Sequence, residues 1–409
     1  MRATRISHAT DAHRKIVGQD RFHHALSASS PRIRAAFVME QVLGHVTWYQ
    51  NLRGAVTELD SVDASWVETR LFDEHGLIER LPVLPSYLRA GLRARVEVRH
   101  ALAQSPADVL VFNTQKPAIF CQPELRRVPS ILMTDVTPLQ YDRMAGLYGH
   151  AVGANSMARL AKHWTNVLNF RLAKMVVPWS NWAADSIINE YGVPRERVQV
   201  IPTGLDTSYW QPGTAEREHE RLRLLFVGGN FERKGGRLLL DVFRGLDLQA
   251  RAELHIVTRD PVESAPGVVV HHNIDNNSLD LLRLYQASDV FVLPTMADCF
   301  SNASIEAMAV GLPVITTNMG GIPDIVEHGK TGLLVEPGDG HELAAALTQL
   351  TDSQSERESF GKAARERALR LFDARINAGR ILGLVECVHA ERVQRNSVAP
   401  RKRQGSLAG

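Results

Sequence analysis

One acidic residue, Glu306, lies in an apolar stretch that has the length of a short helix. Residues 303–310 read Ala-Ser-Ile-Glu-Ala-Met-Ala-Val, and no other side chain in this run can carry a charge. An ionised carboxylate is costly to bury unless a hydrogen-bond donor faces it. The two vicinal hydroxyls of a ribose are suitable donors, whereas an Arg or Lys elsewhere in the chain is the alternative partner. The stretch therefore suggests a nucleotide site.

The start of this helix is suited to binding an anion. Ser301 or Asn302 supplies an N-cap side chain, and a glycine and a proline end the helix before the strand-like run "PVITT". The first amides of a helix lack intrahelical acceptors and carry the positive end of its dipole. We therefore expect the amides near Phe300, Ser301 and Asn302 to bind a phosphate about one turn from Glu306.

Two cations, Arg233 and Lys234, occupy a second turn between a strand and a helix. An apolar run at 222–227 precedes them, and an amphipathic pattern follows at 238–243. A guanidinium fork and an ammonium point charge together suit a diphosphate. The alternative is a solvated basic turn.

A resemblance to a known family rests on two segments. They read "VGGNFERKGG" and "SDVFVLPTMADCFSNASIEAMAVGLPVITTNMGGIPDIVEHGKTGLLVEPGD". In order and spacing they resemble the nucleotide-sugar-binding half of retaining family 4 glycosyltransferases, also called glycosyl transferases group 1. The likeness covers nearly all of residues 222–350 and extends over roughly 155–372. It implies an α/β fold of GT-B type, in which two Rossmann-like, doubly wound parallel-sheet domains face a central cleft.

The resemblance also assigns roles to single residues. The family's motif of Glu, seven residues and Glu falls on Asp298 and Glu306, which contact the donor sugar and the ribose respectively. Asp298 is one methylene shorter than the usual Glu, so sugar preference is left open. Lys234 falls on the family's Lys, while Arg233 substitutes for an Arg that the family places near Gly229.

The implied reaction moves a sugar, with retention, from a UDP- or GDP-type donor to an acceptor hydroxyl. It resembles front-face displacement, in which the leaving diphosphate receives the acceptor's proton. The protein then supplies positive charge and oriented amides, which are expected from Arg233, Lys234 and the helix N-terminus. Gly320 and Gly321 permit the backbone to approach the donor closely, although a tight turn before Ile322 explains them equally well.

The first half of the chain supplies candidates for acceptor binding. The run "AAFVMEQVLGHVTWYQNLR" reads as a strand, a turn at Gly44 and a helix that begins near His45 or Thr47. By resemblance, Gly44 lies opposite the donor phosphates. His45, Trp48 and Tyr49 are candidates for acceptor contact, with helix packing favoured for the two aromatic side chains.

Asp135 is the other acceptor candidate. It follows a strand-like run at a point where family members often place a His. Its carboxylate either orients an acceptor hydroxyl or caps the next helix together with Thr137.

Length and pattern agree with two domains. The chain has 409 residues with 44% hydrophobic content, enough to fill two cores. We expect a flexible tail (1–30), an acceptor-binding domain (31–202), a linker (203–221), a nucleotide-sugar-binding domain (222–372), a helix crossing back to the first domain (373–395) and a disordered tail (396–409). Expected strands cover 35–39, 109–112, 130–133, 175–177, 198–201, 222–227, 253–257, 268–271, 290–293, 314–316 and 333–335.

Composition and motifs disfavour several other classes of protein. A net charge of +2 gives no case for a nucleic-acid partner, and three scattered cysteines indicate neither a disulfide framework nor a zinc site. The "GKT" at 329–331 lacks the first glycine of a P-loop, and "GGNFERKGG" lacks the dinucleotide GxGxxG spacing. No permanently bound cofactor or metal is expected, only the nucleotide-sugar donor and a glycan, lipid-linked or small-molecule acceptor.

The expected location is the cytoplasm. No apolar run has membrane-spanning length, and the first residues lack a secretory signal. The basic end "RKRQGSLAG" allows at most a peripheral contact with the inner face of a membrane. Two other classes stay open: a nucleotide-sugar sensor with little catalytic activity, which the Asp at 298 would explain, and a GT-B epimerase or phosphorylase.

Overall fold

The structure is a computed structural model, and it describes residues 32–42, 44–70, 78, 86–149, 156–213, 220–263 and 265–398. The flexible tail predicted for residues 1–30 lies outside the described residues. Of the disordered tail predicted for 396–409, residues 396–398 instead continue the last helix, and the rest lies outside the described part. Within the predicted linker, residues 214–219 are also outside it.

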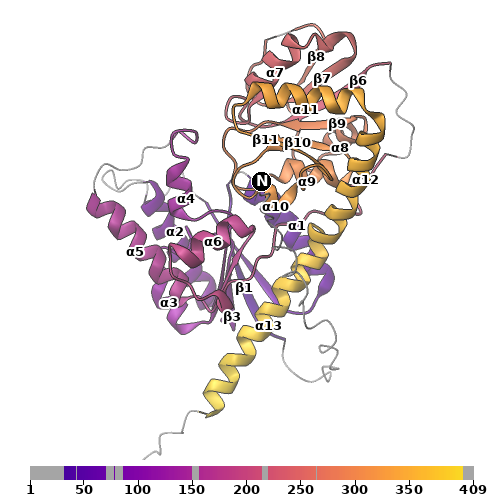
Figure 1. Cartoon of the computed structure of the whole chain (residues 1–409). Helices are drawn as coiled ribbons and strands as arrows, with labels where there is room; N and C mark the ends of the chain where they lie inside the picture. Colours follow the sequence, from indigo (N-terminus) through magenta and orange to yellow (C-terminus); the bar gives the residue numbers. More distant parts are fainter. Residues whose placement is uncertain are drawn as a thin grey trace, which may run out of the picture. The chain divides into compact units, whose positions relative to one another are not determined.

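Five parallel strands form the first sheet, in the order β2-β1-β3-β4-β5 (Figure 1). The strands are β1 (Arg34–Glu40), β2 (Asp63–Thr69), β3 (Val109–Phe112), β4 (Ser130–Thr134) and β5 (Met175–Pro178). The helices of this half are α1 (Gly44–Leu59), α2 (Ser86–Gln104), α3 (Gln122–Arg127), α4 (Pro138–Arg143), α5 (Ser156–Leu172) and α6 (Asn181–Asn189). We call the sheet and these helices the first lobe.

Six parallel strands form the second sheet, in the order β11-β10-β9-β6-β7-β8. They are β6 (Leu222–Val227), β7 (Ala252–Val257), β8 (Val268–His271), β9 (Val290–Leu293), β10 (Val314–Thr317) and β11 (Gly332–Val335). The helices of this second lobe are α7 (Gly236–Gly245), α8 (Leu279–Gln286), α9 (Asn302–Ala309), α10 (Ile322–Ile325), α11 (Gly340–Asp352) and α12 (Gln354–Leu371). The prediction of two doubly wound parallel-sheet α/β domains is confirmed.

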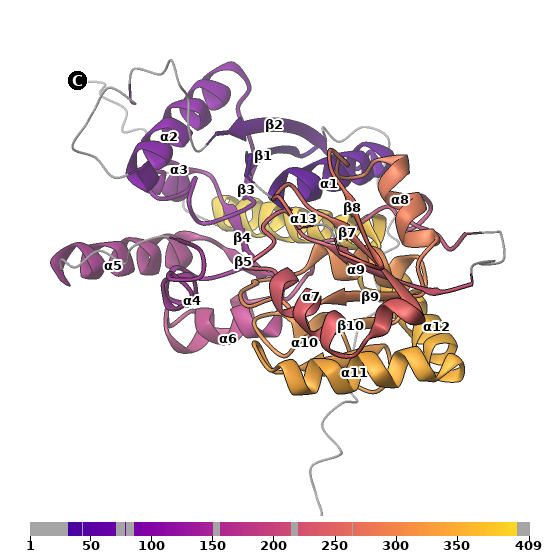
Figure 2. The ribbon, with the colours of Figure 1, turned by 90° about the horizontal axis from the view of Figure 1, so that it is seen from above.

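The central strands are buried along their whole length, as parallel sheets covered on both faces require. Every residue of β3, β4, β9 and β10 is buried. The last helix, α13 (Ala374–Val398), packs against α1, β3 and β4 of the first lobe, and Figure 2 shows it beside them. The chain thus returns to the first lobe after completing the second.

The sequence reasoning erred at two strands. A strand predicted at 198–201 is only an isolated bridge between Val198 and Val176, because the neighbouring strand ends in Pro178, which has no N–H to continue the ladder. The edge strand β2 was missed, because it mixes polar and apolar residues and only part of it is buried. Helix α1 begins at Gly44 itself, so the predicted turn there is wrong by one residue.

Both sheets reverse their strand order at one point, between β1 and β3 in the first sheet and between β6 and β9 in the second. In open parallel sheets, ligands bind beyond the carboxyl ends of the strands at such a reversal. The segments that follow these four strands are therefore the natural place to look for a site.

Candidate active site

Lys234 and Asp298 follow β6 and β9, on the two sides of the reversal in the second sheet. The Lys234 ammonium donates a hydrogen bond to the Asp298 carboxylate, and the side chains are 16% and 9% exposed. The alternative of a solvated basic turn is therefore wrong for Lys234. This ion pair joins the predicted cationic loop to the segment that leads into α9.

Arg233 turns toward the same segment. Its Nη1 donates to the carbonyl oxygen of Ala297 at 2.7 Å, and its guanidinium carbon lies 4.5 Å from the centre of the Tyr148 ring. Tyr148 belongs to the first lobe, so this cation–π contact links the two lobes. The cationic loop thus faces the start of α9 and a tyrosine of the opposite lobe.

The start of α9 is capped by Ser301, whose hydroxyl accepts a hydrogen bond from the Ser304 amide at 3.3 Å. The next residue, Asn302, donates through Nδ2 to the carbonyl oxygen of Gly44 at 3.4 Å and accepts from the Thr203 hydroxyl at 3.1 Å. Phe300 packs against Trp179 of the first lobe, with 6.0 Å between ring centres. The N-terminus of α9 therefore meets the first lobe and the linker.

Glu306 is buried one turn further along α9. The Tyr285 hydroxyl donates to its Oε2 at 3.0 Å, and no Arg or Lys of the described residues forms an ion pair with Glu306. Burial raises the pKa of Glu306 to about 7, and the Tyr285 hydrogen bond offsets only part of that effect. A single neutral donor leaves the carboxylate short of partners, which a ligand with hydroxyl groups would supply.

A small pocket opens over Glu306 between the lobes. Its lining residues are Thr47, Trp48, Asn51, Thr203, Gly204, Leu205, Asn302, Ile305 and Glu306. It brings Glu306 together with residues of α1 and of the 203–205 segment. Glu306 is therefore reached from the space between the lobes.

Three glycines allow backbone to come close around this site. A Cβ on Gly44 would lie 3.2 Å from Asn302 Nδ2, and a Cβ on Gly320, which has φ +56°, would lie 2.3 Å from the Asp298 carbonyl oxygen. A Cβ on Gly321 would approach the Cys299 carbonyl oxygen to 2.8 Å. Gly229, by contrast, is exposed with nothing near its Cβ position, so the structure gives no packing reason for it.

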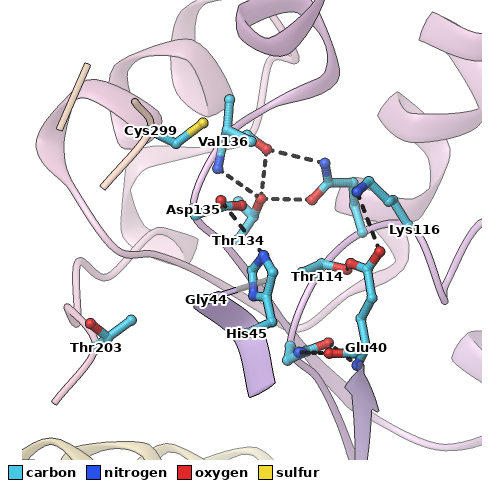
Figure 3. Close-up of polar contacts among 12 residues, drawn as sticks. Glu40, Gly44, His45, Thr114, Lys116, Thr134, Asp135, Val136, Thr203 and Cys299 are labelled. Atoms are coloured by element: carbon cyan, nitrogen blue, oxygen red, sulfur yellow. Dashed lines mark hydrogen bonds and ion pairs between the residues drawn. The ribbon is translucent and has the colours of Figure 1, made fainter. Parts of the chain in front are cut away.

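The acceptor candidates His45 and Asp135 follow β1 and β4, and they come together beyond the carboxyl ends of these strands (Figure 3). His45 Nε2 lies 3.6 Å from Asp135 Oδ2, and the buried Nδ1 atom of His45 has no hydrogen-bond partner among the described residues. Burial raises the pKa of Asp135, but His45 and Lys116 outweigh it, so the pKa lies below its ordinary value. Helix α4 is capped by Thr137 with Gln140, so a capping role for Asp135 is wrong.

The two aromatic candidates in α1 differ. Trp48 lines the pocket and packs on Trp179, with 5.2 Å between ring centres. Tyr49 donates instead to Glu68 at 2.8 Å and packs on Trp66, away from the pocket. Helix packing therefore explains Tyr49, while Trp48 combines packing with a place at the site.

Two family models match this chain, and they divide it as the two lobes do. The model described as Glycosyltransferase Family 4 matches residues 58–209, and that described as Glycosyl transferases group 1 matches residues 221–353. The second match contains Lys234, Asp298 and Glu306. The chain belongs to the family 4 glycosyltransferases.

Curated relatives agree with this membership. An MMP alpha-(1->4)-mannosyltransferase of Mycolicibacterium hassiacum is 29% identical over 51% of this chain and 52% of its own length. A D-inositol 3-phosphate glycosyltransferase of Corynebacterium aurimucosum is 29% identical over 44% and 49%, and the capsular polysaccharide biosynthesis glycosyltransferase CapM of Staphylococcus aureus is 39% identical over 27% and 28%. The chain spans about half the length of the curated relatives it matches.

Solved structures share the fold. The sucrose-phosphate synthase of Thermosynechococcus elongatus superposes with a TM-score of 0.68 at 18% identity, covering 88% of this chain and all of the other. The Anabaena protein Alr3699/HepE, solved with UDP and glucose, gives a TM-score of 0.62 at 16% identity, covering 87% of this chain and 99% of the other. The predicted GT-B fold of this family 4 glycosyltransferase is thus confirmed.

A polar cluster in the first lobe was missed by the sequence reasoning. Glu40, buried at the end of β1, accepts hydrogen bonds from the Thr114 hydroxyl at 2.6 Å and from Lys116 Nζ at 3.3 Å (Figure 3). The Lys116 side chain remains 42% exposed beside Asp135. A charged residue at the end of an apolar strand was the available signal, but its partners follow β3 and could not be paired with it from sequence.

Metal-binding groups are a separate question. Within the described ranges, no three His, Cys, Asp or Glu side chains gather closely enough to hold a metal ion. Metal independence and the absence of a permanently bound cofactor stay predictions.

Proposed function

We propose that this chain transfers a glycosyl group from a nucleoside diphosphate sugar to an acceptor hydroxyl, with retention at the anomeric carbon. One observation carries the proposal. The Lys234–Asp298 ion pair lies beside the segment that leads into α9, and α9 holds the buried Glu306 one turn further on. A cation, oriented amides and a buried carboxylate match the diphosphate and the ribose of such a donor.

The donor ribose would occupy the pocket over Glu306. Its hydroxyls would donate to the carboxylate that, within the described part of the chain, has the Tyr285 hydroxyl as its one side-chain donor. The pyrophosphate would then extend along the first turn of α9 toward Lys234 and Arg233. Phosphate oxygens there would share the Lys234 ammonium with Asp298, or replace Asp298 as its partner.

The reaction would break the bond between the anomeric carbon and the phosphate oxygen while the acceptor oxygen bonds to the same carbon on the same face. The acceptor's proton would pass to an oxygen of the leaving diphosphate. Arg233, Lys234 and the amides at Phe300, Ser301 and Asn302 would stabilise the negative charge that develops there. No side-chain nucleophile is required.

The acceptor would approach from the first lobe. His45 and Asp135 lie beyond the carboxyl ends of its strands, and the Gly44 carbonyl oxygen accepts a hydrogen bond from Asn302 at the α9 N-terminus. The acceptor is a glycan, a lipid-linked sugar or a small molecule. Relatives named for capsular polysaccharide and inositol phosphate glycosylation support a role in glycan or glycolipid biosynthesis.

The proposal includes a cytoplasmic location. None of the helices in the described segments combines the length and the apolar character needed to cross a membrane.

A thermal-shift screen followed by product analysis tests this function. Binding of UDP or GDP and their sugars should raise the melting temperature by several degrees at saturating ligand. A free ligand concentration of roughly 100 times Kd stabilises the folded state by about 2.7 kcal/mol. Transfer should then yield an α-linked product from an α-linked donor, as judged by NMR coupling constants. Glu358→Gln, on the exposed face of α12, is the matched control for Glu306→Gln.

The outcomes separate the classes. Binding without any turnover would favour a sensor, and product formed without acceptor, or from free phosphate, would favour an epimerase or phosphorylase. An inverted linkage would contradict retention while leaving transfer intact.

A further inference from the structure

Helix α5 carries an apolar stripe on the face opposite to the one that packs on the first lobe. Met157, Leu160, Trp164 and Leu168 are 72%, 52%, 56% and 39% exposed, and they recur every three or four residues. The buried positions of the helix are Asn166, Val167, Asn169 and Phe170. One side of α5 is therefore anchored, and the other presents a continuous row of large apolar side chains.

This row is unusual on the described surface. No other helix in the described ranges carries more than two exposed large hydrophobic side chains, and the two on α13, Ile376 and Val393, are seventeen positions apart. Scattered apolar side chains are normal on a protein surface, whereas a contiguous row marks an interaction site. Figures 1 and 2 show α5 at the outer edge of the first lobe in both views.

The surroundings of the stripe are positively charged. Helix α5 contains Arg159, Lys162 and Arg171 and no acidic residue. Lys162 is held by Asp142 at 2.7 Å, while Arg159 and Arg171 are exposed. The neighbouring helix α3 packs on α5 and ends in two exposed arginines, at 126 and 127.

We propose that the α5 stripe docks on an anionic lipid bilayer. A helix with Trp, Leu and Met on one face and flanking arginines lies in the plane of a membrane interface, with its apolar row among the upper acyl chains. The Trp164 indole suits the headgroup boundary, because it has an apolar body and an N–H donor. The flanking cations complement acidic headgroups, which selects a bilayer over a neutral apolar protein surface.

The proposal is independent of the proposed transfer activity, because α5 contributes no residue to the candidate active site. If both hold, docking would place the enzyme at a surface where lipid-linked acceptors are found. A lipid-independent transfer assay would then leave α5 variants fully active.

Co-sedimentation of the full chain with vesicles tests the proposal. We expect binding to vesicles with about one third phosphatidylglycerol, weak binding to pure phosphatidylcholine, and weakening by salt. Trp164→Glu and Leu160→Glu should each reduce partitioning about tenfold or more. Leu369→Glu, 40% exposed on α12, makes the same chemical change elsewhere and should bind like the wild type.

Two results would overturn the proposal. The first is equal vesicle binding by Trp164→Glu, Leu369→Glu and the wild type, or no binding by the wild type to either vesicle. The second is a wild-type protein that forms a dimer in sedimentation equilibrium and does not bind vesicles, with Trp164→Glu monomeric. A second copy of the chain would then be the partner of the stripe. Circular dichroism and melting curves of both variants establish that each is folded, so a loss of binding is not a loss of structure.

Discussion

The Lys234 ammonium is bonded to the Asp298 carboxylate in a nearly buried ion pair at the reversal point of the second sheet. The cation proposed to bind a donor's phosphates thus already neutralises an acid beside them. Breaking a buried pair leaves one uncompensated charge, which destabilises a protein by about 3–5 kcal/mol. Loss of Lys234 therefore affects both stability and phosphate binding, and the two effects need separate measurements.

We predict that Lys234→Met lowers transfer by about a hundred- to a thousandfold, the scale seen when one stabilising donor is lost at a developing negative charge. It should also lower the melting temperature, because Asp298 is left buried without its cation. The double variant Lys234→Met/Asp298→Asn should recover stability but not transfer. Recovery of both in the double variant would contradict the phosphate role. Lys330→Met is the control, because the exposed Lys330 side chain pairs with Glu327 at the surface.

The pH dependence of stability should report on Glu306. Its folded pKa is raised to about 7 from the ordinary 4.5, so the stabilising contribution of the protonated form is complete below pH 4.5 and is lost as pH rises toward 7. Above pH 7 the ionised side chain is then destabilising by about 3 kcal/mol. Glu306→Gln should therefore be more stable than the wild type at pH 8 and similar near pH 4.5, as measured by urea unfolding.

Nucleotide binding should show the opposite trend in the same pH range. Ribose hydroxyls donate to the ionised carboxylate, so UDP or GDP affinity should rise as pH increases through 7 in the wild type and not in Glu306→Gln. Glu358→Gln controls for the loss of one surface charge. Parallel stability curves for wild type and Glu306→Gln would show that this carboxyl does not titrate as proposed.

Much of the fold could be predicted from sequence, because central parallel strands are uninterrupted apolar runs. The predicted bounds of 109–112, 222–227 and 290–293 match β3, β6 and β9, and the edge strand β8, which is also largely apolar, was predicted with its bounds of 268–271. The edge strand β2 lacked such a run and was missed. The pattern thus detects apolar runs, and it fails where a strand mixes polar and apolar residues, as β2 does.

The candidate site could be predicted only in part, for a similar reason. Lys234, Asp298 and Glu306 lie near strand ends or in an apolar helix, where a charge stands out locally. Tyr285, which donates to Glu306, lies in α8 and looks like any core tyrosine until the chain folds. Local patterns reveal unusual charges, whereas their partners depend on tertiary contacts.

The glycine pair after β10 provides a stability test. Gly320 has φ +56°, and a Cβ there would lie 2.3 Å from the Asp298 carbonyl oxygen. Gly320→Ala should destabilise by about 1–3 kcal/mol through backbone strain, with the steric clash added, and should displace the Asp298 backbone. Gly329→Ala has a similar φ of +72° but nothing within 4 Å of the new Cβ, so it isolates the strain. Equal melting temperatures for the two variants would contradict the clash.

The His45–Asp135 contact should control the acceptor and not the donor. The pKa of Asp135 lies below its ordinary value, and its carboxylate lies 3.6 Å from His45 Nε2, where it favours a proton on that nitrogen over one on Nδ1. Asp135→Asn removes this charge and admits the other tautomer. We expect kcat/KM for the acceptor to fall about tenfold, while the KM for the donor stays unchanged.

The matched variants decide between positioning and general destabilisation. His45→Ala should reduce acceptor kcat/KM at least as much as Asp135→Asn, and the double variant should be no worse than His45→Ala, because Asp135 acts through the imidazole. Asp241→Asn, on the exposed side of α7, controls for the lost charge. An additive double variant, or a change in donor KM with unchanged acceptor kinetics, would place these side chains outside acceptor recognition.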